Sequence, residues 1–384
     1  MLHKPLLVAS LALASSLLFA IGAGCSSSST SGASGALGAL DGSEPPAPVA
    51  NGQLGAWQTL APLPVPRANH CSVVVNGYLV VIGGNYKPKG SMTFKDIDEV
   101  DVAKIADDGT LGPWIRAGRT PAAVSSCTAV ASGKSIVLLD GIYAPPPAGT
   151  SPYEGKPQVA TLADDGTLSA FAAASPLSDG VRVLYSTGNV ADDTLYTMFS
   201  RTTAEGDGVS LVTAPLDDAG APGAFTEQRW LPGFRGHPAY AFAQPFVYVL
   251  GGYNAPDDGG ANQVLATGVG AALSQGKAGV PFATAPLPEP TSFGAAVAVD
   301  SFVFAVGGKR EIFSANGRAS VFVGQIDSAG AIAAWTKLQD MPAGRTSLSA
   351  VVGGSFLYVT GGGFDAGGLD TVFAAQVRFP PPTR

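Results

Sequence analysis

The stretch from Cys71 to Gly84, CSVVVNGYLVVIGG, decides the fold of this chain. Two mostly apolar runs flank the pair Asn76-Gly77. An Asn-Gly pair between such runs is typical of a two-residue hairpin turn, because both turn positions need a positive φ angle. The stretch therefore predicts an antiparallel β-hairpin that ends at the glycine pair Gly83-Gly84.

The same pattern returns along the chain after residue 50. Each unit combines an aromatic residue, a proline-containing loop, two apolar runs around a tight turn, and a third run closed by an Asp-rich turn such as Asp107-Asp108-Gly109. We interpret each unit as four strands. The recurring aromatic residues lie 53 to 57 positions apart, at Trp57, Trp114, Phe171, Phe225, Phe282 and Trp335. First strands are expected near Cys71, Cys127, Leu184, Tyr240, Ala295 and Ser349.

Composition and repeat together predict an all-β fold. The chain has 50 Gly and 30 Pro, and only 13% of its residues are charged, which is typical of many short strands joined by turns. A four-stranded unit cannot cover both of its apolar faces alone. We therefore expect the six units to pack around an axis as a six-bladed β-propeller with four antiparallel strands per blade.

The two ends of the repeat region are expected to complete one blade. The last unit stops after its third strand, Thr371–Val377, and lacks a fourth. The segment from Asn51 to Trp57 matches the missing turn and strand. We predict that this N-terminal strand pairs with the C-terminal strand and closes the ring, which leaves no open sheet edge.

Several residues of the first unit carry a family resemblance. They occur in the order of a kelch repeat: Leu63-Pro64, Arg67, His70, the apolar run Tyr78–Ile82, Gly83-Gly84 and the closing Trp114. The chain thus resembles the kelch-repeat β-propeller family over roughly residues 51 to 377. The third unit departs from the pattern, because no glycine pair follows Thr194–Phe199. The resemblance implies the fold but no particular function, since propellers carry unrelated activities.

Residues 1–24 have the organisation of an export signal. His3 and Lys4 precede an apolar run, and small residues lead to Cys25. Residues 21–25, IGAGC, resemble a bacterial lipobox, which implies lipidation of Cys25, although the family usually has Leu where this chain has Gly22. Ser26 resembles the residue found in lipoproteins sent to the outer membrane. Ordinary signal-peptidase cleavage is the alternative, and it would give a secreted or soluble periplasmic protein.

The chain accordingly divides into three parts. Residues 1–24 form the signal peptide, residues 25–50 a Ser/Gly/Ala/Pro-rich linker, and residues 51–384 the propeller. The linker has too few large apolar side chains to offset the entropy of ordering it. A lipid on Cys25 would thus act as a tether and would be the only membrane attachment.

Charge and motifs exclude several classes of partner. Against 29 acidic residues there are 22 basic ones, a net charge of −7, so no basic stripe is available for a nucleic acid. Cofactor motifs are absent, and we expect neither cofactor nor metal. His70 and His237 fall in the first and fourth blades, on opposite sides of the ring, too far apart to share one ion.

Loop lengths indicate which face binds a ligand. Turns between first and second strands, and between third and fourth, are short and share one face. Loops between second and third strands share the other face with the connections between blades, and several are long: Asn85–Asp96, Tyr143–Lys156, Tyr253–Ala261 and Lys309–Arg318. Long varied loops on a rigid scaffold are where binding residues tend to lie.

Arginines recur at the connections that lead into the innermost strands, where we expect the mouth of the central channel. Together with two histidines they make six candidate ligand-binding residues: Arg67, His70, Arg182, Arg235, His237 and Arg345. One interpretation is a cluster that recognises a carboxylate or another anion through paired hydrogen bonds. The other, which we favour, is that each arginine satisfies backbone carbonyls between blades.

Cys71 and Cys127 occupy matching places in the first strands of adjacent blades. In an oxidising compartment these two thiols could form a disulfide between inner strands. The alternative is two buried free thiols that pack as small apolar groups.

Two functions fit this sequence. The first is a noncatalytic binding module, displayed on the cell envelope, that presents its long-loop face to a protein or a glycan. The second is an enzyme acting on an anionic sugar, because the chain is similar in blade number to kelch-type sialic-acid mutarotases. We favour the first, since the sequence offers no convincing acid, base, nucleophile or metal set.

Overall fold

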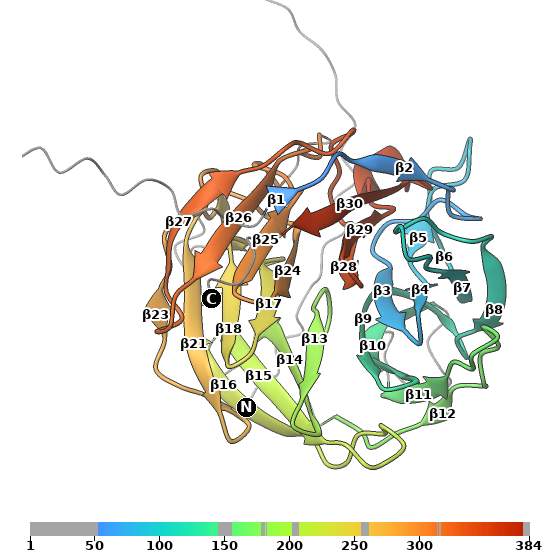
Figure 1. Cartoon of the computed structure of the whole chain (residues 1–384), viewed down its shortest axis with the longest axis horizontal. Coiled ribbons are helices and arrows are strands. Elements are labelled where there is room, and N and C mark those ends of the chain that lie inside the picture. The colour runs from blue at the N-terminus through green and yellow to red at the C-terminus, as the bar shows by residue number, and fades with distance from the viewer. Residues whose placement is uncertain are drawn as a thin grey trace, which may run out of the picture. The chain divides into compact units, whose positions relative to one another are not determined.

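The computed structural model describes residues 53–144, 156–177, 181, 183–201, 207–254, 261–312, 314 and 316–378. Their fold is all-β, with six antiparallel sheets arranged as blades around a central axis. The innermost strands β3, β9, β13, β17, β24 and β28 contact one another in sequence around the ring (Figure 1). The predicted six-bladed β-propeller is thus confirmed.

The first three blades follow one another directly along the chain. Blade 1 consists of β3 (Cys71–Val75), β4 (Tyr78–Ile82), β7 (Glu99–Lys104) and β8 (Ile115–Arg119). Blade 2 consists of β9 (Ala123–Ser132), β10 (Ser135–Ala144), β11 (Gln158–Thr161) and β12 (Ala172–Ala173). Blade 3 consists of β13 (Gly188–Ala191), β14 (Thr194–Arg201), β15 (Gly208–Pro215) and β16 (Thr226–Pro232). The inner strand of blade 3 therefore begins at Gly188, later than the position near Leu184 that the repeat predicts.

The last three blades take in both ends of the described chain. Blade 4 consists of β17 (Ala239–Ala243), β18 (Phe246–Leu250), β21 (Gly268–Ser274), β22 (Lys277–Ala278) and β23 (Phe282–Ala283). Blade 5 consists of β24 (Ala295–Val299), β25 (Phe302–Val306), β26 (Val321–Ile326) and β27 (Ile332–Lys337). Blade 6 consists of β28 (Ser349–Gly353), β29 (Phe356–Thr360), β30 (Val372–Arg378), β1 (Gln53–Leu54) and β2 (Gln58–Leu60).

Three short elements decorate the loops between second and third strands. They are the pair β5 (Asn85–Tyr86) and β6 (Lys95–Asp96) in blade 1, the pair β19 (Tyr253–Asn254) and β20 (Gln263–Val264) in blade 4, and the 3-10 helix η1 (Phe364–Ala366) in blade 6. No helix in the described part of the chain is long and apolar enough to cross a membrane.

The N-terminal strands complete blade 6, as the sequence predicts. Leu54 pairs with Val377, and Gln58 pairs with Ala374, so that β1 and β2 both add to the outer edge of β30. Trp57 lies between them, where its ring meets Phe373 edge-on and its indole nitrogen donates to the carbonyl of Gln339. Closure of the ring by the N-terminal strand is confirmed.

The core lies between blades, because each blade buries both of its faces against its neighbours. All five residues of β4, of β25 and of β29 are buried. Tyrosine hydroxyls at these interfaces also bond the Asp-rich turn of the next blade: Tyr78 to the carbonyl of Asp164 at 3.1 Å, Tyr248 to that of Gly330 at 2.7 Å, and Tyr358 to that of Gly109 at 3.0 Å. Neighbouring blades are thereby held in register.

The turns themselves form as the sequence predicts. Asn76 and Gly77 have φ angles of 51° and 73°, the left-handed values that this hairpin turn requires. Gly109 has a φ of 81°, and a Cβ atom there would lie 2.4 Å from the ring of Phe356 in blade 6. Glycine is therefore required at this turn both for its backbone conformation and for the close approach of the neighbouring blade.

Deletion of residues 53–60 is expected to unfold the propeller or to make it aggregate, because β30 would expose unpaired backbone groups along one edge. Thermal unfolding and size-exclusion chromatography measure both outcomes. The control lacks residues 1–50 only and is expected to melt like the full chain. A deletion variant that melted like this control would contradict ring closure.

Candidate functional site

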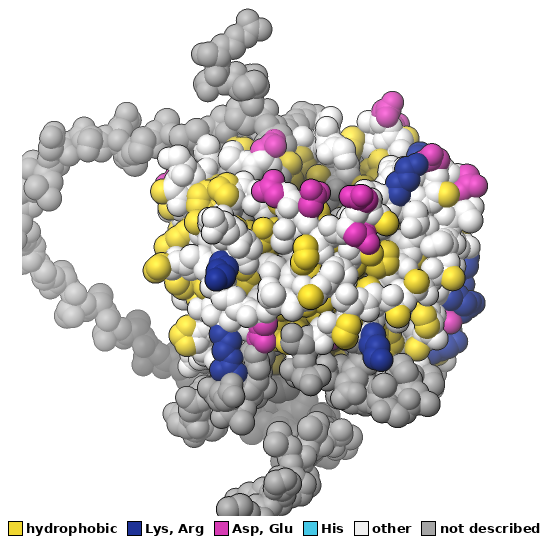
Figure 2. All heavy atoms as spheres, turned by 90° about the horizontal axis from the view of Figure 1, so that it is seen from below, with side chains coloured by type: hydrophobic (Ala, Val, Ile, Leu, Met, Phe, Trp, Pro, Cys, Tyr) yellow, Lys and Arg dark blue, Asp and Glu magenta, His cyan; other side chains and the backbone are white. Residues whose placement is uncertain are grey.

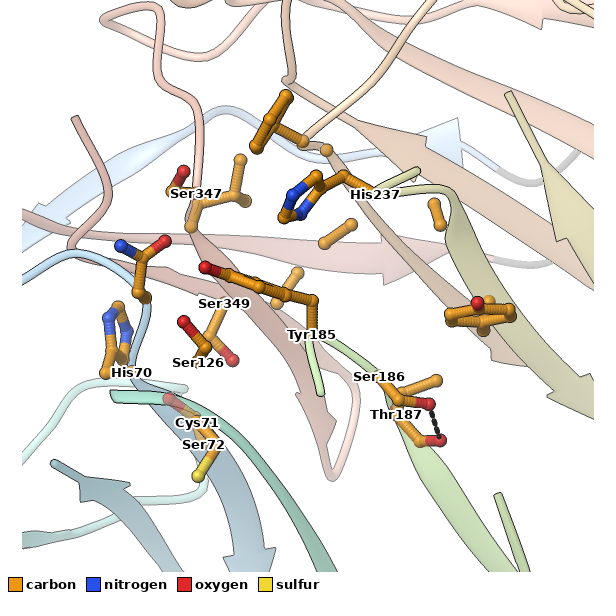
Figure 3. A pocket seen from close by; sticks show the side chains of 18 of the residues that line it. His70, Cys71, Ser72, Ser126, Tyr185, Ser186, Thr187, His237, Ser347 and Ser349 are labelled. Atoms are coloured by element: carbon orange, nitrogen blue, oxygen red, sulfur yellow. Dashed lines mark hydrogen bonds between the residues drawn. The ribbon is translucent and has the colours of Figure 1, made fainter. Parts of the chain in front are cut away.

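A cavity of about 100 Å³ lies at one end of the propeller axis, where the connections into all six inner strands converge (Figure 3). A second cavity of about 250 Å³ lies further along the same inner strands. The two share lining residues from several blades, among them Ser72, Ala129 and Ala350. We call the first cavity the mouth, since it opens the path into the central channel.

The mouth lies on the face that carries the long loops. Isolated bridges pair the connection leading into an inner strand with the start of a second-to-third loop, as between Ala68 and Asn85 and between Gly236 and Tyr253. Two of the long loops, residues 145–155 and 255–260, lie outside the described residues. The Asp-rich turns belong to the opposite face, and Figure 2, which views the propeller from the side, shows acidic side chains gathered in the upper part of the view.

Six residues with left-handed backbones line the mouth, one from each blade. We call them the left-handed ring: Asn69, Ser126, Tyr185, His237, Phe293 and Ser347. Their φ angles lie between 46° and 56°. Few non-glycine residues adopt this conformation, so its repetition in every blade is a property of the site.

Backbone hydrogen bonds link the left-handed ring from blade to blade. The amide of Ser126 donates to the carbonyl of Asn69 at 2.6 Å, and the amide of Tyr185 donates to that of Ser126 at 3.1 Å. Further bonds run from Phe293 to His237 at 3.0 Å, from Ser347 to Phe293 at 2.9 Å, and from Asn69 to Ser347 at 3.0 Å. Each such bond joins adjacent blades, which fixes the positions of the side chains that face the mouth.

The side chains of the left-handed ring fall into two groups. Tyr185, His237 and Phe293 form an aromatic arc, in which the rings of His237 and Phe293 stack at 3.9 Å and Tyr185 meets His237 edge-on at 4.2 Å. Asn69, Ser126 and Ser347 form a polar arc. Figure 3 shows Tyr185 reaching into the cavity, toward the side that carries Ser126 and His70.

The mouth carries no formal charge at neutral pH. Burial, with the nearby charges of Arg67 and Arg345, lowers the pKa of His70 to about 3. Burial and the charge of Lys309 lower the pKa of His237 to about 4. Both imidazoles are therefore neutral, and the described residues that line the mouth include no Asp, Glu, Lys or Arg.

His70 belongs to a buried hydrogen-bond chain behind the polar arc. Its Nε2 lies 2.8 Å from Oγ1 of Thr360, and that hydroxyl lies 3.0 Å from Oγ of Ser72. This chain ties the inner strand of blade 1 to blade 6. Among the residues that the structure describes, no three of His, Cys, Asp and Glu gather as a metal site.

Arg67, Arg235 and Arg345, three of the four arginines that the sequence singles out, do not line the mouth. In three blades the guanidinium Nη1 donates at 2.9 Å to the first carbonyl of the glycine pair: Arg67 to Gly83, Arg235 to Gly251, and Arg345 to Gly361. Arg67 and Arg345 are buried. The structure thus favours backbone satisfaction over anion binding for these three, while Arg182 lies outside the described residues.

Arg67 also makes a buried ion pair. Its Nη2 lies 2.5 Å from Asp101, and both side chains are fully buried. Nε of Arg116, which is partly exposed, lies 2.7 Å from the other oxygen of that carboxylate. Asp101 therefore holds the connection into β3 against the third and fourth strands of blade 1.

Replacing Arg67 with Ala is expected to destabilise the propeller by about 3 kcal/mol, because it leaves Asp101 buried with only Arg116 as a charged partner. Arg119→Ala is the control; this exposed arginine pairs with Asp98, and its loss should cost less than about 1 kcal/mol. Chemical denaturation measures both values. Equal effects of the two substitutions would refute a structural role for the buried pair.

A disulfide joins Cys71 and Cys127, whose Cα atoms lie 5.5 Å apart. It connects the inner strands β3 and β9 of adjacent blades, and both cysteines line the mouth. Of the two alternatives that the sequence leaves open, the structure contains the bridge.

Of the left-handed ring, the sequence singles out His237 alone, together with His70, which follows the ring member Asn69. A signal was present: Asn69, His237 and Ser347 each follow a repeat arginine by two positions. Aligning the units on these arginines would have exposed the register. Residue type alone could not identify these positions, because the six residues share a backbone conformation and differ in side-chain chemistry.

Comparison with known proteins gives a partial match. The chain is 33% identical over 90 residues to a protein of Danio rerio named Kelch repeat and BTB domain-containing protein 12. The match covers 23% of this chain and 14% of that relative. No protein-family model matches the sequence.

Six four-stranded blades, repeated glycine pairs and this relative agree. The chain is a six-bladed propeller whose units resemble kelch repeats. In blades 1, 4 and 6 the arginine and the glycine pair act together, because the guanidinium donates to the first carbonyl of the pair.

Proposed function

We propose that this kelch propeller is a noncatalytic binding module that holds a protein partner on its long-loop face, over the mouth. The observation that carries the proposal is the convergence of all six blades on one uncharged cavity, surrounded by the loops. Kelch propellers in general mediate contacts between proteins. A rigid ring with varied loops suits this task, because little conformational entropy is lost on binding.

An enzyme acting on an anionic sugar is not favoured. That alternative needs arginines at the mouth that can reach a carboxylate. Arg67 and Arg345 instead donate to backbone carbonyls and are buried, and neither lines the mouth. No Lys or Arg lines the described cavity to pair directly with an anionic ligand.

Aromatic residues of the loops are suited to test the binding face. Phe94 and Phe364, from loops of blades 1 and 6, stack with ring centroids 4.3 Å apart, and Tyr253 meets Phe234 at 5.7 Å. Aromatic anchors of this kind dominate the energetics of protein interfaces.

Selection of a phage-displayed peptide library against the full chain should yield ligands that Phe94→Ala and Tyr253→Ala each weaken by about tenfold or more. Lys134→Ala on the opposite face is the control and should leave affinity unchanged, since this exposed side chain pairs with Asp164 there. Titration calorimetry measures the affinities. Peptides unaffected by both loop variants would reject the long-loop face. A parallel glycan array that alone gave ligands would replace the protein partner with a glycan.

We further propose that the propeller is displayed on the bacterial envelope, in the outer membrane, through a lipid on Cys25. The lipobox-like residues 21–25 and the linker after them support this proposal. Residues 1–50 lie outside the described part of the chain, so the support comes from the sequence alone.

Cys25→Ala is expected to move the protein from the membrane fraction to the soluble fraction of a bacterial host and to abolish its labelling by palmitate. Cys71→Ala, which removes a disulfide cysteine, is the control and should keep the label. A Cys25→Ala protein that stayed in the membrane fraction would exclude the lipid tether.

A further inference from the structure

The left-handed conformation of non-glycine residues has two distinct locations in this molecule. Eleven described residues other than glycine have a positive φ angle. Five of them lie in hairpin turns: Asn76, Asp192, Asp193, Gln275 and Asp300. The remaining six are the left-handed ring. Turn positions take Asn, Asp or Gln here, whereas the ring also holds Tyr and Phe, for which this conformation is unfavourable.

Elsewhere the chain uses glycine where only the backbone matters. Both residues of the pairs Gly83-Gly84, Gly251-Gly252, Gly307-Gly308 and Gly361-Gly362 have positive φ angles and lie close to neighbouring backbone. No position of the left-handed ring is glycine, although glycine would adopt the same backbone without strain. The six side chains are thus held at an energetic cost, which indicates a role in binding.

The chemistry of the two arcs defines what fits between them. The aromatic arc offers ring surfaces that are half-buried, and the polar arc offers two hydroxyls and one carboxamide. Behind both, the channel is lined mainly by Ala and Val residues of the inner strands, such as Val74, Ala131 and Val351. The two arcs therefore fit a ligand group that has an apolar flat body and a hydrogen-bonding end.

We propose that the left-handed ring selects one uncharged aromatic side chain of the protein partner, such as tyrosine, with its ring against the aromatic arc and its polar group toward the polar arc. This inference rests on the proposed function, because it names the group through which the partner engages the mouth. A cationic side chain would lose hydration and meet the charge of Lys309, whose Nζ lies 4.7 Å from the centroid of the Phe293 ring, and no Lys or Arg lines the described mouth to pair directly with an anionic side chain.

The probe is p-cresol, the side-chain analogue of tyrosine, titrated into the full chain and followed by saturation-transfer NMR and calorimetry. Its charged counterparts p-toluate and p-methylbenzylammonium, and the neutral sugar methyl β-glucopyranoside, are tested alongside. We expect p-cresol to bind at least about tenfold more tightly than each of the other three. Tighter binding of either charged analogue or of the sugar would overturn the proposal.

Three substitutions separate recognition from folding. Phe293→Leu keeps bulk but removes the ring, and we expect it to weaken p-cresol about tenfold. Ser347→Gly should weaken p-cresol while the protein melts no lower than the parent, because glycine relieves the φ of 53°. Gln275→Gly is the matched control, with a φ of 51° in the β21–β22 turn, and should leave p-cresol binding unchanged.

The outcomes distinguish this inference from the proposed function. Unchanged p-cresol binding in both ring variants, or loss of folding in Ser347→Gly, would overturn the ring as the selecting element. Peptide ligands that depend on Phe94 and Tyr253 but coexist with no p-cresol binding would overturn the inference and leave the proposed function standing. If neither such peptide ligands nor p-cresol bound, the proposed function and this inference would both be rejected.

Discussion

The pairing of the first described strands with the last one is the constraint on which this molecule depends. β1 and β2 add to β30, so residues separated by almost the whole chain share a sheet. The pairing completes blade 6, and blade 6 meets blade 1 through the bond from the amide of Asn69 to the carbonyl of Ser347 and through that from the hydroxyl of Tyr358 to the carbonyl of Gly109.

Two further sets of hydrogen bonds fix the inner strands around the mouth. In blades 1, 4 and 6 an arginine holds the connection that leads into the inner strand, through the first carbonyl of the glycine pair. Tyrosine hydroxyls hold the opposite ends of the blades to neighbouring turns. The inner strands are thereby fixed at both ends. A side chain in the left-handed ring consequently has a defined direction even though its φ angle is unfavourable by itself.

The fold was largely predictable because the repeat carries it. Asn76-Gly77, the glycine pairs and the recurring aromatic residues each specify local structure by backbone conformation or burial, and local rules suffice there. The start of β13 was misplaced near Leu184, since blade 3 lacks the glycine pair that sets the register elsewhere. The site was predictable only in part. His70 and His237 do line the mouth, but the orientation of Arg67 and Arg345 depends on carbonyls that only the assembled blades bring together.

The left-handed ring has a consequence for how such a protein could diversify. Its backbone bonds are made by amides and carbonyls, which every amino acid except proline supplies. These hydrogen bonds therefore place few demands on the identity of the six side chains, provided that each residue adopts the left-handed backbone. A propeller built in this way could acquire a new ligand by exchanging six letters of its sequence, while the arginines, tyrosines and glycines that hold it together stay the same.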